Sequence, residues 1–366
     1  EKGIFMSNRK ILHVDMDSFY ASVEKERKGL EGPIVICVYS GRTEDSGAVS
    51  TCSYDARDLG IHAAMPITQA KSIAEESEDE VHFLPMDREY YREVSDKIRD
   101  QIYENYAEKI EQASIDEAYL DITEEAGSFE EAERLAGEIQ KEVRKGFGIT
   151  CSVGIGPNKL VAKIASDREK PEGLTTVLPE EVDDFMQGLE LEDIHGIGGK
   201  TVEKLEDLGI NSVEELAKAD RRKLVEKFGE NLGMKIQDKA RGIDDEPVKE
   251  KMQKQITRIT TLDQNSRSAN HIKTYFPDLA DEIFEQLEEK DLRFGQVVLV
   301  VIDTDIQMHT RSRKLKARIK DKEKLVEEEE ALLEDFLDEF EGEVRRIGLR
   351  VSDLEEDSSQ KKLESF

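Results

Sequence analysis

The sequence predicts a multidomain protein of the α+β class, and three observations lead to that prediction. The chain has 366 residues, which is enough for two or three hydrophobic cores. Its first half contains short apolar runs typical of strands, among capped segments whose apolar residues have helical spacing. A glycine-containing helical stretch follows, and the chain closes with a strand, helix, strand, strand, helix, strand order.

The formal net charge of −30, from 83 acidic and 53 basic residues, argues at face value against nucleic acid as a partner. The acids cluster, however, at 75–80 and 327–330, whereas 306–320 contains six bases and no acid. An acidic surface with local basic stripes is typical of salt-adapted proteins. In about 1 M salt the Debye length is roughly 3 Å, so remote acids hardly repel DNA. The alternative is simple solubilising charge.

The remaining composition predicts a soluble cytoplasmic protein that makes no membrane contact. The chain contains no run of 18 apolar residues and no charged-apolar-small leader pattern. Cys37, Cys52 and Cys151 are scattered without a C-x-x-C pair, which argues against a disulfide framework or a zinc site. We expect them to be buried apolar residues.

Two adjacent carboxylates, Asp116 and Glu117, interrupt the apolar run 112–122. Neighbouring residues on a strand point to opposite faces, and a buried ionised carboxylate needs a cation or strong hydrogen bonds. One interpretation is a tight hairpin between strands at 109–113 and 118–122, with Asp116 as a turn former. The other is that the pair holds metal.

A second acidic group lies near the start of the chain, where Asp15 ends an apolar strand at 11–16 and a helix at 18–27 begins. Three hard oxygen ligands from two strand ends would suit Mg²⁺, which prefers carboxylates together with substrate phosphates. Two such ions form a phosphoryl-transfer centre.

The stretch 13–24 (HVDMDSFYASVE), together with 114–117 (SIDE), resembles the catalytic signature of Y-family DNA polymerases of the DinB type. The likeness extends from about Lys10 to Asp353. It implies a right-hand polymerase with a palm, small fingers, a helical thumb and a C-terminal little finger. The implied reaction is DNA-templated attack of a primer 3′-OH on the α-phosphate of a dNTP, used for translesion synthesis. In it Asp15, Asp116 and Glu117 hold two Mg²⁺, and Met16 contributes its backbone carbonyl.

The same resemblance implies a nucleotide site. Tyr20 would be the steric gate whose ring occupies the space of a ribose 2′-OH, although it could simply be a core aromatic. Thr51, Tyr54 and Arg57 match residues that touch the incoming triphosphate, and Tyr54 and Arg57 can share a helical face. Without the resemblance we would expect a packed Tyr beside a surface Arg. Lys163 matches a triphosphate-contacting lysine, an assignment that rests entirely on the resemblance.

The palm is expected to be a sheet covered by helices on one face. Ser128 and Glu131 form a capping box that opens a helix with inward Ala132, Leu135, Ile139 and Val143. The other elements predicted in this half are strands at 33–39 and 149–155 and helices at 67–75 and 158–167.

The stretch 191–210 resembles a helix-hairpin-helix motif. Gly196 and Gly198 would let backbone N–H groups beside Lys200 approach a DNA phosphate without reading a base. The alternative is a tight turn with a structural role only. Capped helices are then expected after Ser212 and at 220–228.

After a mixed-charge linker the pattern is a split βαβ fold. Its strands are predicted at 255–262, 295–303, 306–319 and 344–352, and its helices at 272–288 and 322–340. Lys314, Lys316 and Arg318 alternate with apolar residues, so that one strand face is basic, and Arg345 and Arg346 add charge on the last strand. The resemblance makes this face a DNA grip, whereas the alternative is a solvated sheet face.

The tail contains Gln360, Leu363 and Phe366, a Q-x-x-L-x-x-F spacing that resembles the peptide by which polymerases dock on a sliding clamp. The expected partners are primer-template DNA, dNTP and a sliding clamp, and we expect a monomer.

One rival function is a catalytically silent, clamp-tethered DNA-binding protein, and another is a different palm-type nucleotidyl transferase or cyclase. The predicted boundaries are 1–26 with 84–170 for the palm, 27–83 for the fingers, 171–242 for the thumb, 243–254 for the linker, 255–352 for the little finger and 353–366 for the tail.

Overall fold

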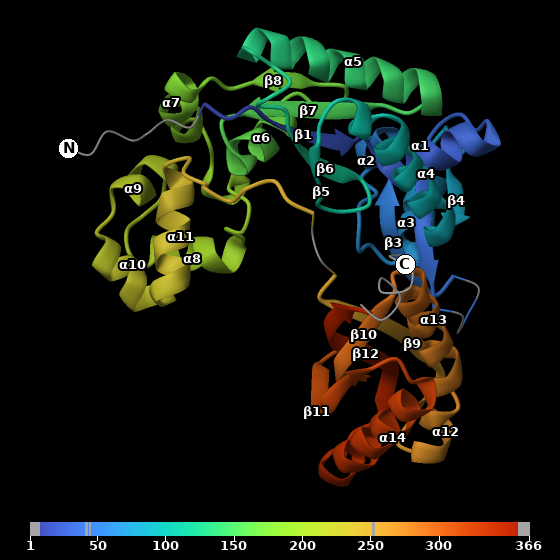
Figure 1. The fold of residues 1–366 in the computed structure, drawn as a ribbon. Helices are drawn as coiled ribbons and strands as arrows, with labels where there is room; N and C mark the ends of the chain where they lie inside the picture. The colour runs from blue at the N-terminus through green and yellow to red at the C-terminus, as the bar shows by residue number, and fades with distance from the viewer. Residues whose placement is uncertain (1–7, 41–42, 44, 251–252, 358–366) are drawn as a thin grey trace, which may run out of the picture. The chain divides into compact units, whose positions relative to one another are not determined.

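A computed structural model describes the chain except for residues 1–7, 41–42, 44, 251–252 and 358–366 (Figure 1). The chain divides into two compact units, residues 1–38 with 48–251 and residues 39–47 with 252–366. The predicted clamp-binding residues Gln360, Leu363 and Phe366 lie outside the described residues. Within the described ranges, no helix is both long and apolar enough to cross a membrane.

The first unit is built on a five-stranded sheet with the order β5-β6-β1-β7-β8. The central strand β1 is buried along its whole length and pairs antiparallel with β6 on one side and β7 on the other. The strands are β1 (Ile11–Met16), β5 (Lys109–Gln112), β6 (Glu117–Asp121), β7 (Cys151–Gly156) and β8 (Leu174–Thr176). The predicted hairpin is confirmed as β5 and β6, with Asp116 in the turn between them.

One face of this sheet carries the main hydrophobic core. Leu12 and Val14 of β1 point into it together with apolar residues of the long helix α5 (Phe129–Phe147). Ser128 caps α5 as predicted by accepting a hydrogen bond from the N–H of Glu131, but the second bond of a capping box, from the Ser128 N–H to Glu131, is shifted by one residue. The Glu131 carboxylate in turn accepts from the N–H of Gly127. The other helices near this core are α1 (Phe19–Lys28), α4 (Arg88–Gln101) and the short η1 (Tyr103–Asn105).

The expectation that helices cover only one face of the sheet is wrong. Helix α6 (Lys159–Ser166) packs on the opposite face of β1 and β7, and Figure 1 shows α5 and α6 on the two sides of the sheet. The close approach depends on Gly154, because a Cβ there would collide with the backbone of Ala162 and Ser166. The buried His13 of β1 meets this helix through a 2.8 Å contact between its Nδ1 and Ser166 Oγ.

A three-stranded sheet, ordered β3-β2-β4, forms a smaller layer with its own core. Its elements are β2 (Ile34–Tyr39), β3 (Gly47–Cys52), β4 (His82–Pro85), α2 (Tyr54–Asp58) and α3 (Ile67–Glu75). Cys37 and Cys52 are buried here and Cys151 is buried in the larger core, all three as free thiols, so the prediction of buried apolar cysteines is confirmed.

A cluster of short helices follows the five-stranded sheet. The apolar core of this cluster also contains Leu160 and Ile164, so α6 packs both on the sheet and on the helices. The sequence boundary expected at 170/171 therefore does not coincide with a gap in packing. The elements are η2 (Pro179–Glu181), α7 (Val182–Gln187), η3 (Leu191–Asp193), α8 (Gly199–Glu206), α9 (Val213–Lys218), α10 (Arg221–Phe228) and α11 (Glu230–Ala240).

The segment 243–250, predicted as a linker, is packed along the first unit. Asp244 accepts a hydrogen bond from the N–H of Leu160, the first turn of α6. Val248 is only 3% exposed and packs with Ile11 and Tyr119. Sequence patterning missed this contact because one apolar residue in a charged segment has no periodicity.

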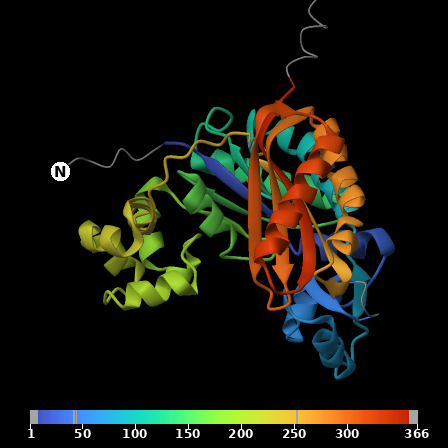
Figure 2. The same ribbon diagram turned by 90° about the horizontal axis from the view of Figure 1, so that it is seen from below.

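The second unit is a four-stranded antiparallel sheet, ordered β11-β10-β12-β9, with its helices on one face (Figure 2). The split βαβ prediction is confirmed, because β12 lies between β9 and β10, and β10 lies between β11 and β12. The last strand continues past the predicted end at 352 because Leu292 and Glu356 are still register partners. The elements are β9 (Gln255–Ser266), α12 (Ala269–Lys273), α13 (Phe276–Glu289), β10 (Leu292–Asp303), β11 (Met308–Ile319), α14 (Lys322–Glu339) and β12 (Val344–Glu356).

Candidate active site

The β1–β6 register places two of the predicted carboxylates side by side. Asp15 on β1 is the direct register partner of Glu117 on β6. Both therefore lie on the same sheet face, which is the α6 face and not the main core. The N–H of Met16 donates to the Asp116 carbonyl over 2.9 Å, which fixes the turn residue at the end of β1. The hairpin interpretation of the acidic pair is confirmed, since Asp116 is in the turn and Glu117 begins β6, whereas the metal interpretation stays a prediction.

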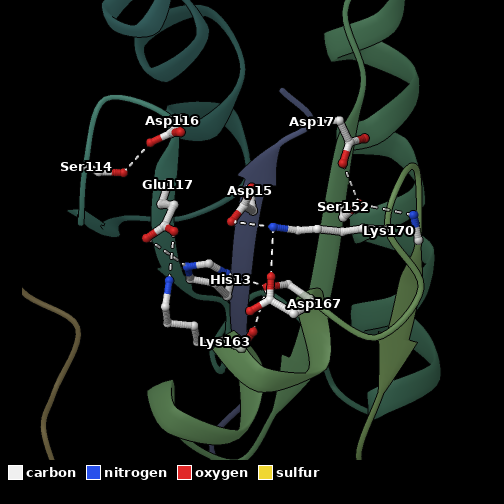
Figure 3. A network of polar contacts seen from close by, with 12 residues as sticks. His13, Asp15, Asp17, Ser114, Asp116, Glu117, Ser152, Lys163, Asp167 and Lys170 are labelled. Atoms are coloured by element: carbon white, nitrogen blue, oxygen red, sulfur yellow. Dashed lines mark hydrogen bonds and ion pairs between the residues drawn. The ribbon is translucent and has the colours of Figure 1, made fainter. Parts of the chain in front are cut away.

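Each strand carboxylate is paired with a lysine (Figure 3). Lys170 Nζ lies 2.8 Å from Asp15 Oδ2, and Lys163 Nζ lies 2.8 Å from Glu117 Oε1. Asp116 is held differently, because its Oδ1 accepts a 2.6 Å hydrogen bond from the hydroxyl of Ser114. The three acidic residues therefore lie close together, but each has a different hydrogen-bond or ion-pair partner.

The two strand carboxylates have opposite pKa shifts. Burial raises the pKa of Asp15 to about 7; Lys170 opposes the shift, and the negative charges of Glu117 and Asp116 reinforce it. Contacts with His13 and Lys163 lower the pKa of Glu117 below its ordinary value, and burial opposes that change. The His13 Nε2 atom is 3.7 Å from Glu117 Oε2, which is too long for a direct hydrogen bond, so Lys163 makes the closer contact.

The donor chemistry fits a hard divalent cation. Asp15, Asp116 and Glu117 supply carboxylate oxygens from adjacent backbone positions, and their mutual repulsion is a cost that a cation would relieve. In the part of the chain that the structure describes, no three His, Cys, Asp or Glu side chains already converge as a metal cluster. Asp15 and Glu117 are instead held in separate ion pairs with the two lysine amines.

A cavity of about 390 Å³ opens beside Asp15. Of the five residues predicted to bind nucleotide, Tyr20, Thr51, Tyr54 and Arg57 line it, and Lys163 does not. The full lining is Asp15, Met16, Ser18, Phe19, Tyr20, Ser50, Thr51, Tyr54, Arg57, Asp116 and Lys170.

Tyr20 lies between the cavity and the hydrophobic core, and its role as a steric gate stays a prediction. Its ring lines the cavity and is stacked on Tyr91, with centroids 4.4 Å apart and planes 16° apart. Tyr91 is fully buried, so the ring of Tyr20 has a rigid aromatic surface behind it. A group that enters the cavity would therefore contact a Tyr20 ring that Tyr91 keeps in place.

Local structure explains how Tyr54 and Arg57 meet. Ser53 caps α2 by accepting from the N–H of Ala56, and its hydroxyl also accepts from the N–H of Ile34 on β2. The helix places the Arg57 guanidinium over the Tyr54 ring, 4.8 Å from its centroid. The predicted shared helical face is confirmed.

Lys170 is the residue that sequence reasoning missed. It follows α6 in a loop, with no periodic pattern that would mark it, and only the fold brings it to the cavity and to Asp15. Its amine also lies 2.8 Å from Asp167 Oδ1. Lys163, which the resemblance indicated for the triphosphate, instead faces Glu117.

Asp17 organises the loop that carries Lys170. Although it is only two residues from Asp15, it is not among the cavity residues. Its carboxylate accepts 2.8 Å hydrogen bonds from the hydroxyls of Thr150 and Ser152, and a 2.9 Å bond from the N–H of Glu172. Asp17 thus joins the end of β1 to the neighbouring strand β7, as its bond to Ser152 shows in Figure 3, and to the loop before β8.

The predicted helix-hairpin-helix is built as its glycines require. Gly196 has a φ of +94°, and Lys239 Nζ donates to the neighbouring His195 carbonyl over 2.6 Å. Gly198 precedes α8 without a side-chain cap, and a Cβ on it would meet no atom within 4 Å. Lys200 is exposed at the same helix start.

The predicted basic residues of β11 lie on the face of the strand that points away from the core. Leu315 and Ile319 pack on the core, as predicted, while Lys314, Lys316 and Arg318 are exposed. Arg318 is already paired with Asp353 and Glu355. On β12, Ile347 and Leu349 point into the core. The predicted Arg346 and the unpredicted Arg350 therefore face the side without helices, and Arg345 lies beside the register shift at Val344.

Three family models match the chain. They are the impB/mucB/samB family at residues 14–167, the C-terminal domain of that family at 253–364, and the DNA polymerase-iota thumb domain at 192–244. DNA polymerase IV of Methanosarcina acetivorans is 40% identical over 98% of this chain and 99% of its own length. DNA polymerase IV of Saccharolobus solfataricus is also 40% identical, over 93% of this chain and 96% of its own.

Solved structures give the same result. A Y-family DNA polymerase chimera of Dbh and Dpo4 matches 95% of this chain and all of its own, with a TM-score of 0.87 and 34% identity. The chain belongs to the Y family of DNA polymerases. As a Y-family enzyme it is a DNA-directed DNA polymerase of the translesion type, and a catalytically silent accessory protein is not favoured. An insertion ternary complex of Dbh DNA polymerase matches with a TM-score of 0.71 and 33% identity, over 95% of this chain and 100% of its own.

Proposed function

We propose that this Y-family chain adds dNTPs to a primer 3′ end in the cavity beside Asp15, during translesion synthesis. The observation that carries the proposal is the juxtaposition of Asp15 and Glu117 across β1 and β6, next to a cavity lined by Tyr20 and Arg57. Y-family polymerases use divalent metal. Asp15, Asp116, Glu117 and the Met16 carbonyl would hold two Mg²⁺, which supply charge stabilisation for the attacking and leaving oxygens.

The chain's own groups would orient the nucleotide. Arg57 and Lys170 bring positive charge to the cavity and would bind the triphosphate, with Tyr54 and the Thr51 hydroxyl as hydrogen-bonding partners. Tyr20, backed by Tyr91, would fill the space of a 2′-OH. Lys163 is proposed to position Glu117 and not to contact the nucleotide directly.

The matched Dbh ternary complex supports nucleotide and DNA as partners of this chain. We propose the palm, fingers, thumb and little finger at the boundaries predicted from sequence, with α6 shared between palm and thumb. Backbone N–H groups at Gly196 and Gly198, with Lys200, would contact phosphates. The helix-free sheet face, with Lys314, Lys316, Arg318, Arg345 and Arg346, and with Arg350 added, would grip the DNA backbone.

Primer extension with Mg²⁺ on undamaged and abasic templates tests the central proposal. Asp116→Ala and Glu117→Ala should each lower extension by at least about a hundredfold while DNA binding changes little, because the lost group does not grip duplex. Glu93→Ala, on the exposed surface of α4, is the matched control and should extend normally. Robust extension by both site variants would refute the assignment.

The C-terminal peptide is proposed to bind a sliding clamp, with Leu363 and Phe366 entering an apolar groove and Gln360 hydrogen-bonding beside it. Deleting 360–366 should leave extension without clamp unchanged and abolish stimulation by clamp. Equal stimulation of the truncated and full chains would contradict this role. We also propose a monomeric, cytoplasmic enzyme, which analytical ultracentrifugation and cell fractionation would test.

A further inference from the structure

The Lys170 amine lies where two different anions can use it. It is 2.8 Å from Asp15 Oδ2, and Lys170 is also one of the residues that line the cavity with Tyr54 and Arg57. Its side chain is 23% exposed, so the amine can reach a ligand in the cavity as well as the carboxylate. Asp167 Oδ1, 2.8 Å from the same amine, is a second carboxylate partner of Lys170.

Electrostatics should prevent the Lys170 amine from staying beside Asp15 once a metal ion or a triphosphate binds. A cation bound to Asp15 would stand within a few ångströms of the amine and repel it, because like charges at that distance interact strongly in a partly buried site. A triphosphate in the cavity would instead attract the amine away from Asp15. The Lys170 amine can therefore compete with a metal ion for Asp15 and can also bind the nucleotide.

We propose that the Lys170 amine exchanges between Asp15 and the incoming triphosphate, so that it lowers metal affinity in the empty site and becomes available when nucleotide arrives. This inference rests on the proposed function, in which Asp15 holds metal and the cavity holds the triphosphate. Lys170 then couples the loading of metal to the loading of nucleotide. By linkage, each favours the other.

Removing the charge should have two opposite effects. In Lys170→Gln the nucleotide-free, DNA-free protein should bind Mn²⁺ about tenfold more tightly, and the KM for dNTP in extension should rise about tenfold. A residue with only a structural role would weaken both interactions. Mn²⁺ binding is measured by the loss of the free-ion EPR signal, so this reading does not depend on activity. Lys170→Arg keeps the charge and should bind Mn²⁺ like the unmodified protein.

Lys163 provides the matched comparison within the same site. It pairs with Glu117 but does not line the cavity, so Lys163→Gln should tighten Mn²⁺ binding with little effect on the KM for dNTP. Lys97→Gln, in the exposed pair with Glu93, should change neither quantity. An equal rise in dNTP KM in the Lys163 and Lys170 variants would overturn the proposal.

The unmodified chain offers a second test that does not require a variant to fold. Mass spectrometry after brief amine acylation should show Lys170 labelled about fivefold faster when Mn²⁺ is added, and slower again when a dNTP follows. Unchanged labelling on adding Mn²⁺ would refute the exchange. A failure of the proposed function can be told apart from a failure of the exchange. If Asp15 does not hold metal, Asp15→Asn should retain both Mn²⁺ binding and extension.

Discussion

Asp15 and Glu117 face each other across β1 and β6, yet one has a pKa raised to about 7 and the other a pKa lowered below its ordinary value. The difference arises from their surroundings. Asp15 has the greater burial cost, whereas Glu117 contacts His13 and Lys163. A pair of acids with opposed shifts is a common feature of sites built for chemistry and not for stability.

The first prediction is that Asp15 lowers stability at neutral and higher pH. An acid whose folded pKa is raised stabilises the fold below its unfolded pKa, near 3.8, and loses that contribution as pH rises through about 7. Asp15→Asn should therefore raise the melting temperature at pH 8 by about 2–4 °C, with a smaller rise at pH 5, where only part of the contribution has been lost. Asp96→Asn, at an exposed site on α4, is the control. A shift of equal size at both pH values would contradict the assigned cause.

The second prediction concerns sugar selection. Tyr20→Ala should open the space in front of Tyr91 and raise the ratio of rNTP to dNTP incorporation by at least about tenfold, because the steric wall is lost. Tyr20→Phe retains the ring and should keep the original ratio. Single-nucleotide extension with matched rNTP and dNTP series measures the ratio. If Tyr20→Ala leaves it unchanged, Tyr20 serves the core alone.

The third prediction concerns the packed segment 243–250. Lys159 Nζ makes 2.8 and 2.9 Å contacts with Glu111, which is 2% exposed and also accepts from the N–H of Lys249. Lys159→Met should cost about 3 kcal/mol in urea unfolding, because it removes the positive charge that faces the buried Glu111 carboxylate.

The same variant should make the segment 243–250 easier to cleave in limited proteolysis. Lys97→Met breaks only an exposed pair and should cost less than about 1 kcal/mol. Unfolding that is equally sensitive to both substitutions would show that the buried pair has no special role.

The fourth prediction concerns Glu329 on α14, whose side chain is fully buried. Burial raises the pKa of Glu329 well above its ordinary value, and backbone N–H groups of Arg350 and Val298 oppose the shift only in part. Below the raised pKa the Glu329 carboxyl group is protonated and neutral, which avoids a buried charge. The second unit should therefore lose stability as the pH rises. Glu329→Gln should flatten this dependence in urea melts of the full chain between pH 5 and 9. A slope that the variant retains would assign it to other groups.

The fifth prediction concerns salt. If the net charge of −30 is an adaptation, self-repulsion should destabilise the fold at low salt. The melting temperature should then rise with KCl, and extension should persist near 1 M KCl, while DNA affinity falls through counterion release. A melting temperature that is independent of KCl would favour simple solubilising charge.

Local patterns were sufficient for much of the architecture. The β5–β6 hairpin, the Ser128 cap and the split βαβ order each follow from short-range periodicity and turn chemistry, which neighbouring residues control. The acidic turn at Asp116 and the shared face of Tyr54 and Arg57 were predictable for the same reason. Such features require only residues that are close in sequence.

Only the tertiary structure decided which side chains meet. Lys170, in a loop after α6, reaches Asp15 through the fold of five strands, and no sequence spacing encodes that contact. The turn of Asp17 away from the cavity depends on hydroxyls of β7 and its preceding residue, contributed more than 130 positions later. Val248 became a core residue because β1, β6 and α6 leave a site that it fills. Sequence periodicity reports the face on which a residue lies, whereas long-range packing decides what that face contacts.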